Sequence, residues 1–320
     1  MTNRKGGLSK VFDYFCNEDP FAEGLSPCPG CPLELALRLL GKILGSQDLV
    51  MTGTPSCSNP VMTGQNVGAW HRLTAYCTLM TGAAANATGL SRQYRRSGQD
   101  ATVVCFNGDG CAADIGFQAL SGAAERGENF IYVCYDNEGY MNTGVQRSGT
   151  TPIGAKTATT PVGPKQRGKS TRRKNLPLLM AMHRIPYAAT ATLSHLEDFA
   201  KKLLKAKEKK NEGLAYIHLF APCPTGWGVP THQAIEVCRN AVRTNYFPLW
   251  EAEKGIFTLT HQVKKPKPIM EYTRLIKKYN HLKEDELERI QEEVDYEYEF
   301  LRHLTEFRKC VATKHQTAGE

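Results

Sequence analysis

Long apolar runs are missing from this 320-residue sequence, which excludes a membrane-spanning helix of about 20 consecutive apolar residues. Residues 1–10 are polar and lack the apolar segment of a secretory signal peptide. No internal repeat is visible. We therefore expect a cytoplasmic protein without a membrane partner. A hydrophobic content of 41% over this length supports the core of one large α/β domain or two smaller ones.

Aromatic residues are absent from the clearest basic stretch, which includes Lys165, Arg167, Lys169, Arg172, Arg173 and Lys174. The net charge of +8 could attract an acidic partner. A basic loop without interleaved aromatic residues does not indicate nucleic-acid binding, so we expect no nucleic-acid partner. The pattern favours a solvated face over a binding patch.

The cysteine content is high, with 11 residues. An odd count without a secretion signal argues against a disulfide framework, and metal or cluster ligation better explains at least a subset. Cys105 and Cys134 lie within apolar stretches and are expected in the core. Cys77, Cys238 and Cys310 lie in helix-like stretches, and we expect them in the core as well.

Four other cysteines lie in loops rich in Pro, Gly or Ser: Cys28, Cys31, Cys57 and Cys223. The first two form a C-x-x-C pair, and each of the other two follows an apparent strand. Four thiolates are the ligand set of a [4Fe–4S] cluster. A zinc site or plain buried cysteines remain alternatives. One close pair with two distant singles suits a cluster better than a structural zinc site, which usually shows two close pairs.

Residues 108–110 read Gly-Asp-Gly, and 26 residues separate Gly110 from Asn137. Apolar runs precede both points and predict buried strands, whose C-terminal ends are where open α/β sheets bind ligands. Asp109 and Asn137 offer oxygen ligands for Mg²⁺. Gly108 and Gly110 let the backbone turn sharply and approach phosphate oxygens. The spacing therefore predicts a site that holds thiamin diphosphate through a divalent metal ion.

Strand and helix signals alternate from residue 28 to about residue 250, which predicts a parallel sheet with helices on both faces. Asp114 is expected to cap the helix at 115–126. Residues 138–173 show no periodicity, and a loop of this length is usually functional or disordered, so we expect its start to fold over the cofactor. The strands are predicted at 48–53, 101–106, 130–136, 186–192 and 214–220, and the helices at 33–44, 68–85, 115–126, 175–183, 194–209 and 231–244.

The tail differs in character, so we divide the chain into an α/β domain at 1–260 and a linker with a helical arm at 261–320. A basic, proline-containing run at 264–268 is typical of a linker. Residues 283–307 are acidic and carry apolar residues at helical spacing. They could form a surface helix docked on this chain or an arm that contacts another subunit, and both interpretations stay open.

Three histidines are left out of the predicted site. His71 and His183 lie among apolar residues at helical spacing, which favours structural roles. His218 precedes Cys223 in an apparent strand and is expected in the core or behind the residues that bind the cofactor.

Together, these motifs resemble the β subunit of 2-oxoacid:ferredoxin oxidoreductases, the pyruvate synthase family, over nearly the whole chain up to about residue 251. That family often has glycine where this chain has Pro32, which removes a backbone N–H but suits the first turn of the next helix. We expect the cluster to survive this change. The matching segments are 28–31, 108–110, 114–116, 119–126, 140–144, 151–152, 154–155, 160–163 and 221–227.

The resemblance implies a doubly wound, mostly parallel sheet of the thiamin diphosphate-binding (PP) type with a C-terminal helical extension. It implies that Asp109, Asn137 and the backbone carbonyl of Gly139 bind Mg²⁺. Asn142 would face the thiazolium ring and take part in catalysis. The four loop cysteines named above would hold one [4Fe–4S] cluster close to the thiamin diphosphate.

The implied activity is oxidative decarboxylation of a 2-oxoacid, with electrons leaving singly through the cluster to ferredoxin and the acyl group usually passing to coenzyme A. The reverse, synthase direction is equally compatible. Pyruvate is the default substrate, and indolepyruvate, 2-oxoisovalerate, 2-oxoglutarate, phenylglyoxylate and oxalate stay open. An α subunit would supply the glutamate that contacts the pyrimidine ring, and a ferredoxin-like subunit is also expected.

Two other functions remain. The first is a non-redox thiamin diphosphate-dependent decarboxylase or synthase whose cysteines bind zinc or nothing. The second is a non-enzymatic assembly subunit, against which the combination of Asp109, Asn137 and Asn142 argues.

Overall fold

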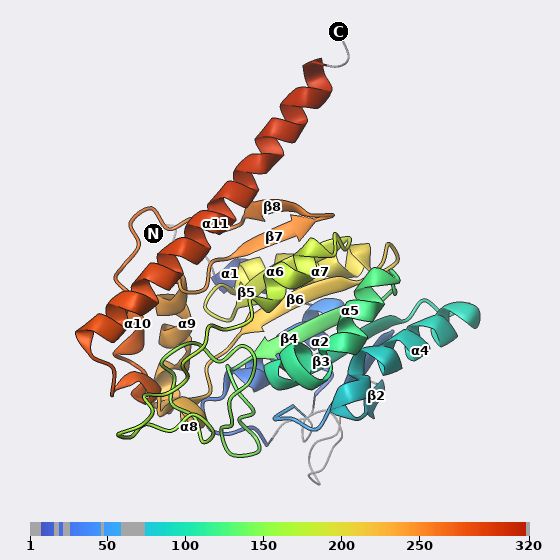
Figure 1. The fold of residues 1–320 in the computed structure, drawn as a ribbon. Coiled ribbons are helices and arrows are strands. Elements are labelled where there is room, and N and C mark those ends of the chain that lie inside the picture. The colour runs from blue at the N-terminus through green and yellow to red at the C-terminus, as the bar shows by residue number, and fades with distance from the viewer. Residues whose placement is uncertain (1–7, 16–18, 22–25, 46–47, 59–73, 318–320) are drawn as a thin grey trace, which may run out of the picture.

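A single sheet organises the protein. The computed structural model describes residues 8–15, 19–21, 26–45, 48–58 and 74–317. Eight strands in these ranges form the order β2-β1-β3-β4-β6-β5-β7-β8 (Figure 1). The first six strands pair in parallel, and only the β5–β7 and β7–β8 pairs are antiparallel, which confirms the predicted doubly wound, mostly parallel α/β fold. The strands are β1 (Leu49–Gly53), β2 (Thr74–Cys77), β3 (Thr102–Gly108), β4 (Ile131–Asp136), β5 (Tyr187–Thr192), β6 (Ala215–Phe220), β7 (Trp250–Glu253) and β8 (Ile256–Leu259).

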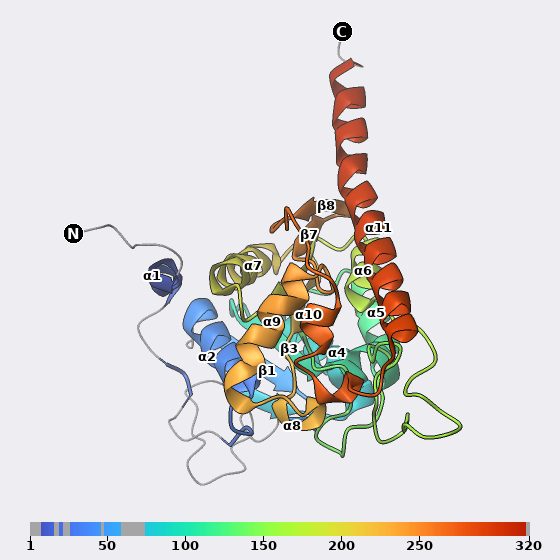
Figure 2. The same ribbon diagram turned by 90° about the vertical axis from the view of Figure 1, so that its left-hand side faces the viewer.

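Helices cover both faces of the sheet, because its central strands are apolar on both sides. Helices α2 and α7 pack on one face, and α4, α5, α6 and part of α11 pack on the other (Figure 2). Among the described residues, no helix has the length and apolar character needed to cross a bilayer. The helices are α1 (Leu8–Val11), α2 (Pro32–Leu44), α4 (Ala83–Arg96), α5 (Phe117–Glu125), α6 (Leu176–Met182), α7 (Leu196–Lys209), α8 (Pro224–Trp227), α9 (Ala234–Arg243), α10 (Met270–Thr273) and α11 (Glu284–Thr317).

Short turns of other helical types connect several of these elements. Five are described: η1 (Phe12–Tyr14), η2 (Met80–Gly82), η3 (Cys111–Ile115), η4 (Thr231–Gln233) and η5 (Lys277–Tyr279). Four of them are 3₁₀ turns, and η3 is a π-helix.

The helix predicted at 68–85 is wrong. Within its described part, the chain forms the edge strand β2 and the turn η2, and α4 begins only at Ala83. Residues 68–73, including His71, lie outside the described residues. Cys77 is therefore exposed on β2 and not a core residue, whereas Cys105, Cys134 and Cys238 are buried as predicted. The side chain of Cys310 also lies outside the described part.

Four adjacent parallel strands end at the same edge of the sheet and deliver the predicted site residues there. In spatial order, the strands are β1, β3, β4 and β6. They are followed along the chain by Cys57, Asp109, Asn137 and Cys223 respectively. This edge is where ligands bind in open α/β sheets, so the topology alone gathers residues that are distant in sequence.

Helix α11 docks on the basic loop, which the sequence predicted to be a solvated face. Arg167 pairs with Glu286 at 2.7 Å, and Arg173 pairs with Glu297 at 3.0 Å. Lys169 is buried, and its ammonium donates to two backbone carbonyls. The prediction of a solvated face is wrong for Lys169 and Arg173, which are buried and half-buried, whereas the other four basic residues of the loop are exposed as predicted. Ile290, Val294 and Leu301 of α11 join the core, and the last turns extend past β8 (Figure 1).

Candidate active site

Three oxygen atoms converge where β3 and β4 end, and we call them the oxygen site: Asp109 Oδ1, Asn137 Oδ1 and the Gly139 carbonyl. The Asn137 amide oxygen faces Asp109 Oδ1 at 3.1 Å and the Gly139 oxygen at 2.9 Å. In the protein without a cation, the amide is satisfied when it is turned by 180°, so that its nitrogen donates to both oxygens. The oxygen-inward orientation suits a cation instead, because neighbouring ligands of Mg²⁺ with bonds of about 2.1 Å lie about 3.0 Å apart.

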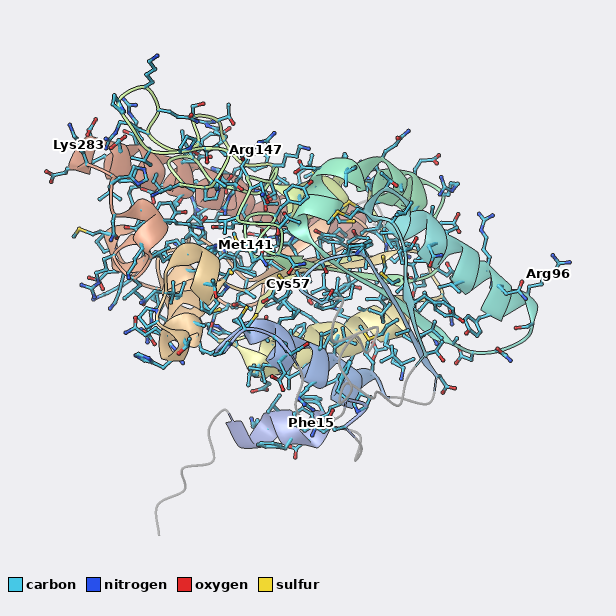
Figure 3. All side chains as sticks on the ribbon, turned by 90° about the horizontal axis from the view of Figure 1, so that it is seen from below. Phe15, Cys57, Arg96, Met141, Arg147 and Lys283 are labelled. Carbon is cyan, nitrogen blue, oxygen red and sulfur yellow. The ribbon has the colours of Figure 1, made fainter. Side chains whose placement is uncertain are left out.

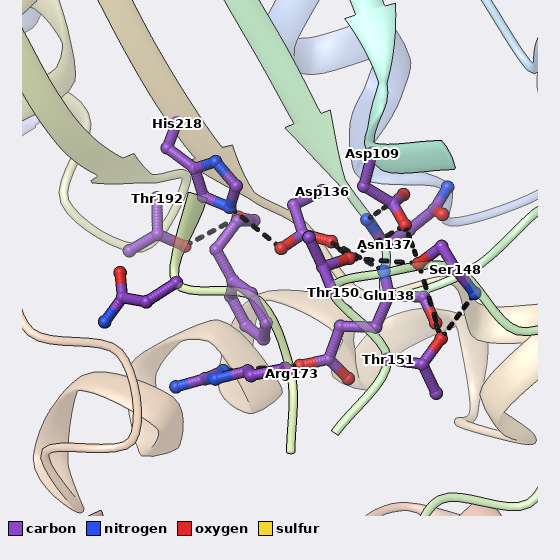
Figure 4. A network of polar contacts seen from close by, with 12 residues as sticks. Asp109, Asp136, Asn137, Glu138, Ser148, Thr150, Thr151, Arg173, Thr192 and His218 are labelled. Carbon is purple, nitrogen blue, oxygen red and sulfur yellow. Dashed lines mark hydrogen bonds and ion pairs between the residues drawn. The ribbon is translucent and has the colours of Figure 1, made fainter. Parts of the chain in front are cut away.

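The second oxygen of Asp109 is held by hydroxyl groups of the long loop (Figure 4). Ser148 Oγ and Thr150 Oγ1 both contact Asp109 Oδ2, the latter at 2.8 Å. Burial raises the pKa of Asp109 well above its usual value, and the charge of Asp136 adds to this effect. The hydroxyls commit one carboxylate oxygen to hydrogen bonds and leave the other facing Asn137. The start of the loop therefore folds over the oxygen site.

Asp136 and His218 support this arrangement from behind. His218 Nε2 lies 2.8 Å from Asp136 Oδ2, and His218 Nδ1 lies 2.7 Å from the Tyr216 hydroxyl. Thr150 Oγ1 also lies 2.9 Å from Asp136 Oδ1 (Figure 4). Burial would raise the pKa of Asp136, but the hydrogen bond and charge of His218 hold it below its usual value. Asp136 is thus anionic beside Asp109, and His218 lies behind the site as predicted.

The turn after Asp109 is built around Tyr140. A Cβ added to Gly110 would lie 2.4 Å from the Tyr140 ring, so only glycine fits there. Asp114 lies inside the π-helix η3 and caps no helix, which corrects its predicted role. Its carboxylate instead accepts from the Gly149 N–H at 2.9 Å and the Tyr140 hydroxyl at 3.3 Å. Asp114 therefore ties the long loop to the turn, and Gly108 ends β3 at the rim of a cleft.

Cys28, Cys31, Cys57 and Cys223, which we call the thiol site, come together from three segments. Burial raises the pKa of Cys57 to about 12, and the charges of the other three thiols add to this effect, which requires that they lie nearby. Burial also raises the pKa values of Cys31 and Cys223. Cys28 is exposed and the other three are half-buried.

Two helix starts and one close backbone contact hold the thiol site. Cys31 precedes α2, whose first residue is Pro32, as predicted, and Cys223 precedes α8 and accepts from the Gly226 N–H at 3.1 Å. Gly30 has φ +71°, and a Cβ there would lie 2.3 Å from the Thr231 oxygen. The turn at 28–31 thus packs against the segment that follows Cys223.

A cleft lies between the two sites. Its lining includes Cys57, Gly108, Asn137 and Met141. Cys57 and Met141 both appear near the middle of the view in Figure 3. Asn142 is exposed at this cleft, so its predicted contact with the thiazolium ring remains a prediction.

Sequence reasoning missed several residues that shape the site. Ser148 and Thr150 contact Asp109 from a loop without periodicity, and no local pattern marks them. Asp136 had a signal, because it is a carboxylate at the end of a buried strand beside Asn137. His183 is exposed and lies 3.2 Å from the Ser121 hydroxyl, away from the residues described above.

Comparison with known proteins places the chain among the thiamin diphosphate-binding enzymes. Residues 57–219 match the family described as "Thiamine pyrophosphate enzyme, C-terminal TPP binding domain". The chain is 46% identical over 279 residues to pyruvate synthase subunit PorB of Methanothermobacter thermautotrophicus, covering 87% of this chain and 96% of that protein. It is 41% identical over 301 residues to ketoisovalerate oxidoreductase subunit VorB of Pyrococcus horikoshii, covering 90% of this chain and 94% of that protein.

A solved structure agrees with these relatives. The 2-oxoglutarate:ferredoxin oxidoreductase from Magnetococcus marinus superposes with a TM-score of 0.52 at 28% identity, over 69% of each chain. The chain therefore belongs to the family of thiamin diphosphate-binding β subunits of 2-oxoacid:ferredoxin oxidoreductases.

Proposed function

We propose that this chain is the catalytic β subunit of a 2-oxoacid:ferredoxin oxidoreductase that oxidatively decarboxylates pyruvate. The observation that carries the proposal is the convergence of three oxygens at the strand ends with four cysteines beside them. The relatives named for pyruvate and ketoisovalerate support a 2-oxoacid substrate. 2-Oxoisovalerate, 2-oxoglutarate, indolepyruvate, phenylglyoxylate and oxalate are the alternatives that a substrate screen must separate.

Magnesium fits the oxygen site by chemistry and spacing. Asp109, Asn137 and the Gly139 carbonyl offer hard oxygen ligands, with oxygen–oxygen distances of 3.1 and 2.9 Å. Ser148 and Thr150 orient the carboxylate. Diphosphate oxygens and a water would complete the six ligands.

A four-iron cluster fits the thiol site better than zinc. A tetrahedral zinc ion with Zn–S bonds of about 2.3 Å needs thiolates about 3.8 Å apart. In the described part of the chain, no three His, Cys, Asp or Glu side chains are close enough to hold a single metal ion. The four thiols are nevertheless near enough for their charges to interact. One close pair and two distant single cysteines supply the four thiolates that a [4Fe–4S] centre needs.

When bound, thiamin diphosphate supplies a carbanion for attack on the 2-oxoacid carbonyl, and an adjacent cluster accepts electrons singly. The chain's own residues bind the cofactor and orient it. Gly108 and Gly110 let the backbone approach the diphosphate, and Gly110 fits only because it lacks a Cβ beside Tyr140. Asn142, exposed at the cleft, would face the reacting carbon. Half-burial of Cys31, Cys57 and Cys223 limits the access of water to their sulfurs.

The relatives are named as subunits, which implies a heteromeric complex. We propose an α subunit that supplies the glutamate for the pyrimidine ring and a ferredoxin-like subunit that passes electrons to ferredoxin. Coenzyme A would accept the acyl group.

Anaerobic analysis of iron, sulfide and thiamin tests the proposal. The complex is purified through a tag on this chain. The other subunits are purified separately, without this chain, and their iron content is subtracted from that of the complex. About four iron and four sulfide with one thiamin diphosphate per chain are expected. Thiamin diphosphate with zinc, or with empty cysteines, would replace the proposal by a non-redox decarboxylase. Reduction of a viologen dye with a series of 2-oxoacids would then identify the substrate.

A further inference from the structure

A buried lysine from the C-terminal segment pairs with the residue that separates two members of the oxygen site. Lys278 lies in η5, and its side chain is 4% exposed. Its ammonium pairs with the carboxylate of Glu138, a residue 140 positions earlier that lies between Asn137 and Gly139. The pair is fully enclosed, since the Glu138 side chain is 1% exposed. Such a pair is strongly disrupted when one partner is removed, because an uncompensated charge remains buried.

Glu138 carries the backbone bend that aims the two neighbouring ligands. Its φ is +61°, in the left-handed region that disfavours residues with a side chain. Its N–H donates to Asp136 Oδ1 at 2.8 Å, and its carbonyl accepts from Thr151 Oγ1 at 2.7 Å. The Tyr246 hydroxyl also donates to its carboxylate. The two backbone contacts hold the ends of the bend, and Tyr246 and Lys278 hold the side chain that projects from it.

The same lysine contacts the segment that carries Cys223. Lys278 Nζ lies 3.4 Å from the centroid of the Trp227 ring, a close cation–π contact. Trp227 Nε1 in turn donates to the backbone carbonyl of Asn137 at 2.9 Å. One ammonium group therefore touches both the bend between the metal ligands and the helix that begins after Cys223.

We propose that Lys278 is a positioning residue of the cofactor site, acting through Glu138 and Trp227 to hold Asn137 and Gly139 in the geometry that binds the metal. The inference rests on the proposed function. It assigns the C-terminal segment, outside the matched residues 57–219, an indirect part in cofactor binding. Arg173, with Nη1 4.0 Å from Glu138, partly neutralises the same carboxylate but does not reach Trp227 in the described contacts.

The test measures Mg²⁺-dependent binding of thiamin diphosphate by calorimetry in the anaerobically purified complex. Lys278→Met should weaken binding about 10–100-fold, the usual effect of removing a residue that orients metal ligands. Lys278→Arg, which keeps the charge, should restore part of this loss. Because Lys278 acts through Glu138, Glu138→Gln combined with Lys278→Met should cost less than the sum of the single changes. The iron content should stay unchanged.

Lys202→Met is the matched control, because Lys202 is another buried lysine, paired with Asp198 at 2.6 Å. It should leave thiamin diphosphate affinity within about twofold. Unchanged affinity in Lys278→Met, or an equal loss in Lys202→Met, would overturn the proposal. If Lys278→Met fails to assemble, the affinities of Lys278→Arg and Glu138→Gln for thiamin diphosphate test the proposal instead, and unchanged affinity in both would overturn it. No Mg²⁺-dependent binding in the parental complex would instead refute the proposed function.

Discussion

Asp109 and Cys28 lie at the same edge of the sheet, yet their surroundings differ sharply. Asp109 is fully buried, and hydroxyls of Ser148 and Thr150 fix one of its oxygens. Cys28 is exposed, and its three partner thiols are half-buried. The oxygen site is thus shaped by the protein itself, whereas the thiol site depends more on what it binds. Hydrogen bonds that orient a ligand in advance raise the affinity of a site for its metal. Thiols must lose their protons to bind a metal, so metal binding itself helps to form a site made of cysteines.

The largest expected effect would come from breaking the oxygen site. Asp109→Ala removes the charged member of the proposed ligand set, and even changes to residues that only orient ligands typically cost about 10–100-fold in metal affinity. We expect thiamin diphosphate affinity and 2-oxoacid oxidation in the complex to fall by more than about 100-fold, with subunit assembly intact. Asp100→Ala, at an exposed carboxylate paired with Lys210, is the control. Full activity in Asp109→Ala would contradict the assignment.

The independence of the two sites can be tested with Cys57→Ser. Loss of one of four thiolates should remove about four iron per chain and the associated visible absorption. Thiamin diphosphate binding should persist, because the oxygen site is held by its own hydrogen bonds. Cys77→Ser, at an exposed cysteine on β2, should change neither quantity. Joint loss of iron and thiamin diphosphate in Cys57→Ser would show that the sites form as one unit.

The buried carboxylate also predicts a pH dependence. Burial raises the pKa of Asp109, so between an unfolded value of about 3.9 and the higher folded value the native state binds more protons. The contribution of Asp109 to the stability of the cofactor-free complex should therefore fall as pH rises through that window. Asp109→Asn should remove this slope and raise the thermal midpoint near neutral pH. Added Mg²⁺ and thiamin diphosphate should raise the thermal midpoint of the parental protein alone, so that it then exceeds the midpoint of Asp109→Asn.

The smallest effect is expected away from both sites. Arg167 is partly exposed and pairs with Glu286 of α11 at 2.7 Å. Exposed ion pairs contribute about 0–1 kcal/mol, so Arg167→Gln should lower the free energy of unfolding by no more than that. Activity should be unchanged. A larger loss in urea unfolding would mean that this pair, and not the apolar face of α11, holds the helix.

The central strands could be predicted because each is a short apolar run between turn residues. β4 was expected at 130–136 and lies at Ile131–Asp136. β2 was missed because three exposed residues and one half-buried residue give no burial pattern to distinguish a strand from a helix. The β7–β8 hairpin was missed as well, although Lys254 and Gly255 both have positive φ, as its two-residue turn requires.

The residues of the site also divide into those that could be predicted from the sequence and those that could not. Asp109 and Asn137 could be predicted because spacing and strand ends are local properties. Ser148 and Thr150 could not, because the path of an irregular loop sets their contacts. Lys278 could not either, since its partner lies 140 residues earlier and nothing near it in sequence indicates burial.

The order of strands β1-β3-β4-β6 has a consequence for how the protein matures. The oxygen site takes its atoms from residues 109–139, but Asp136 beside it is held by His218 of β6, and Glu138 is held by Lys278. Cys223 lies beyond β6, which pairs with β4 only after the chain has returned from β5. Contacts between segments so far apart in sequence form late in folding. Under the proposed function, both sites would therefore be complete only once β6 is in place, and binding of iron or of thiamin diphosphate would report a completed sheet.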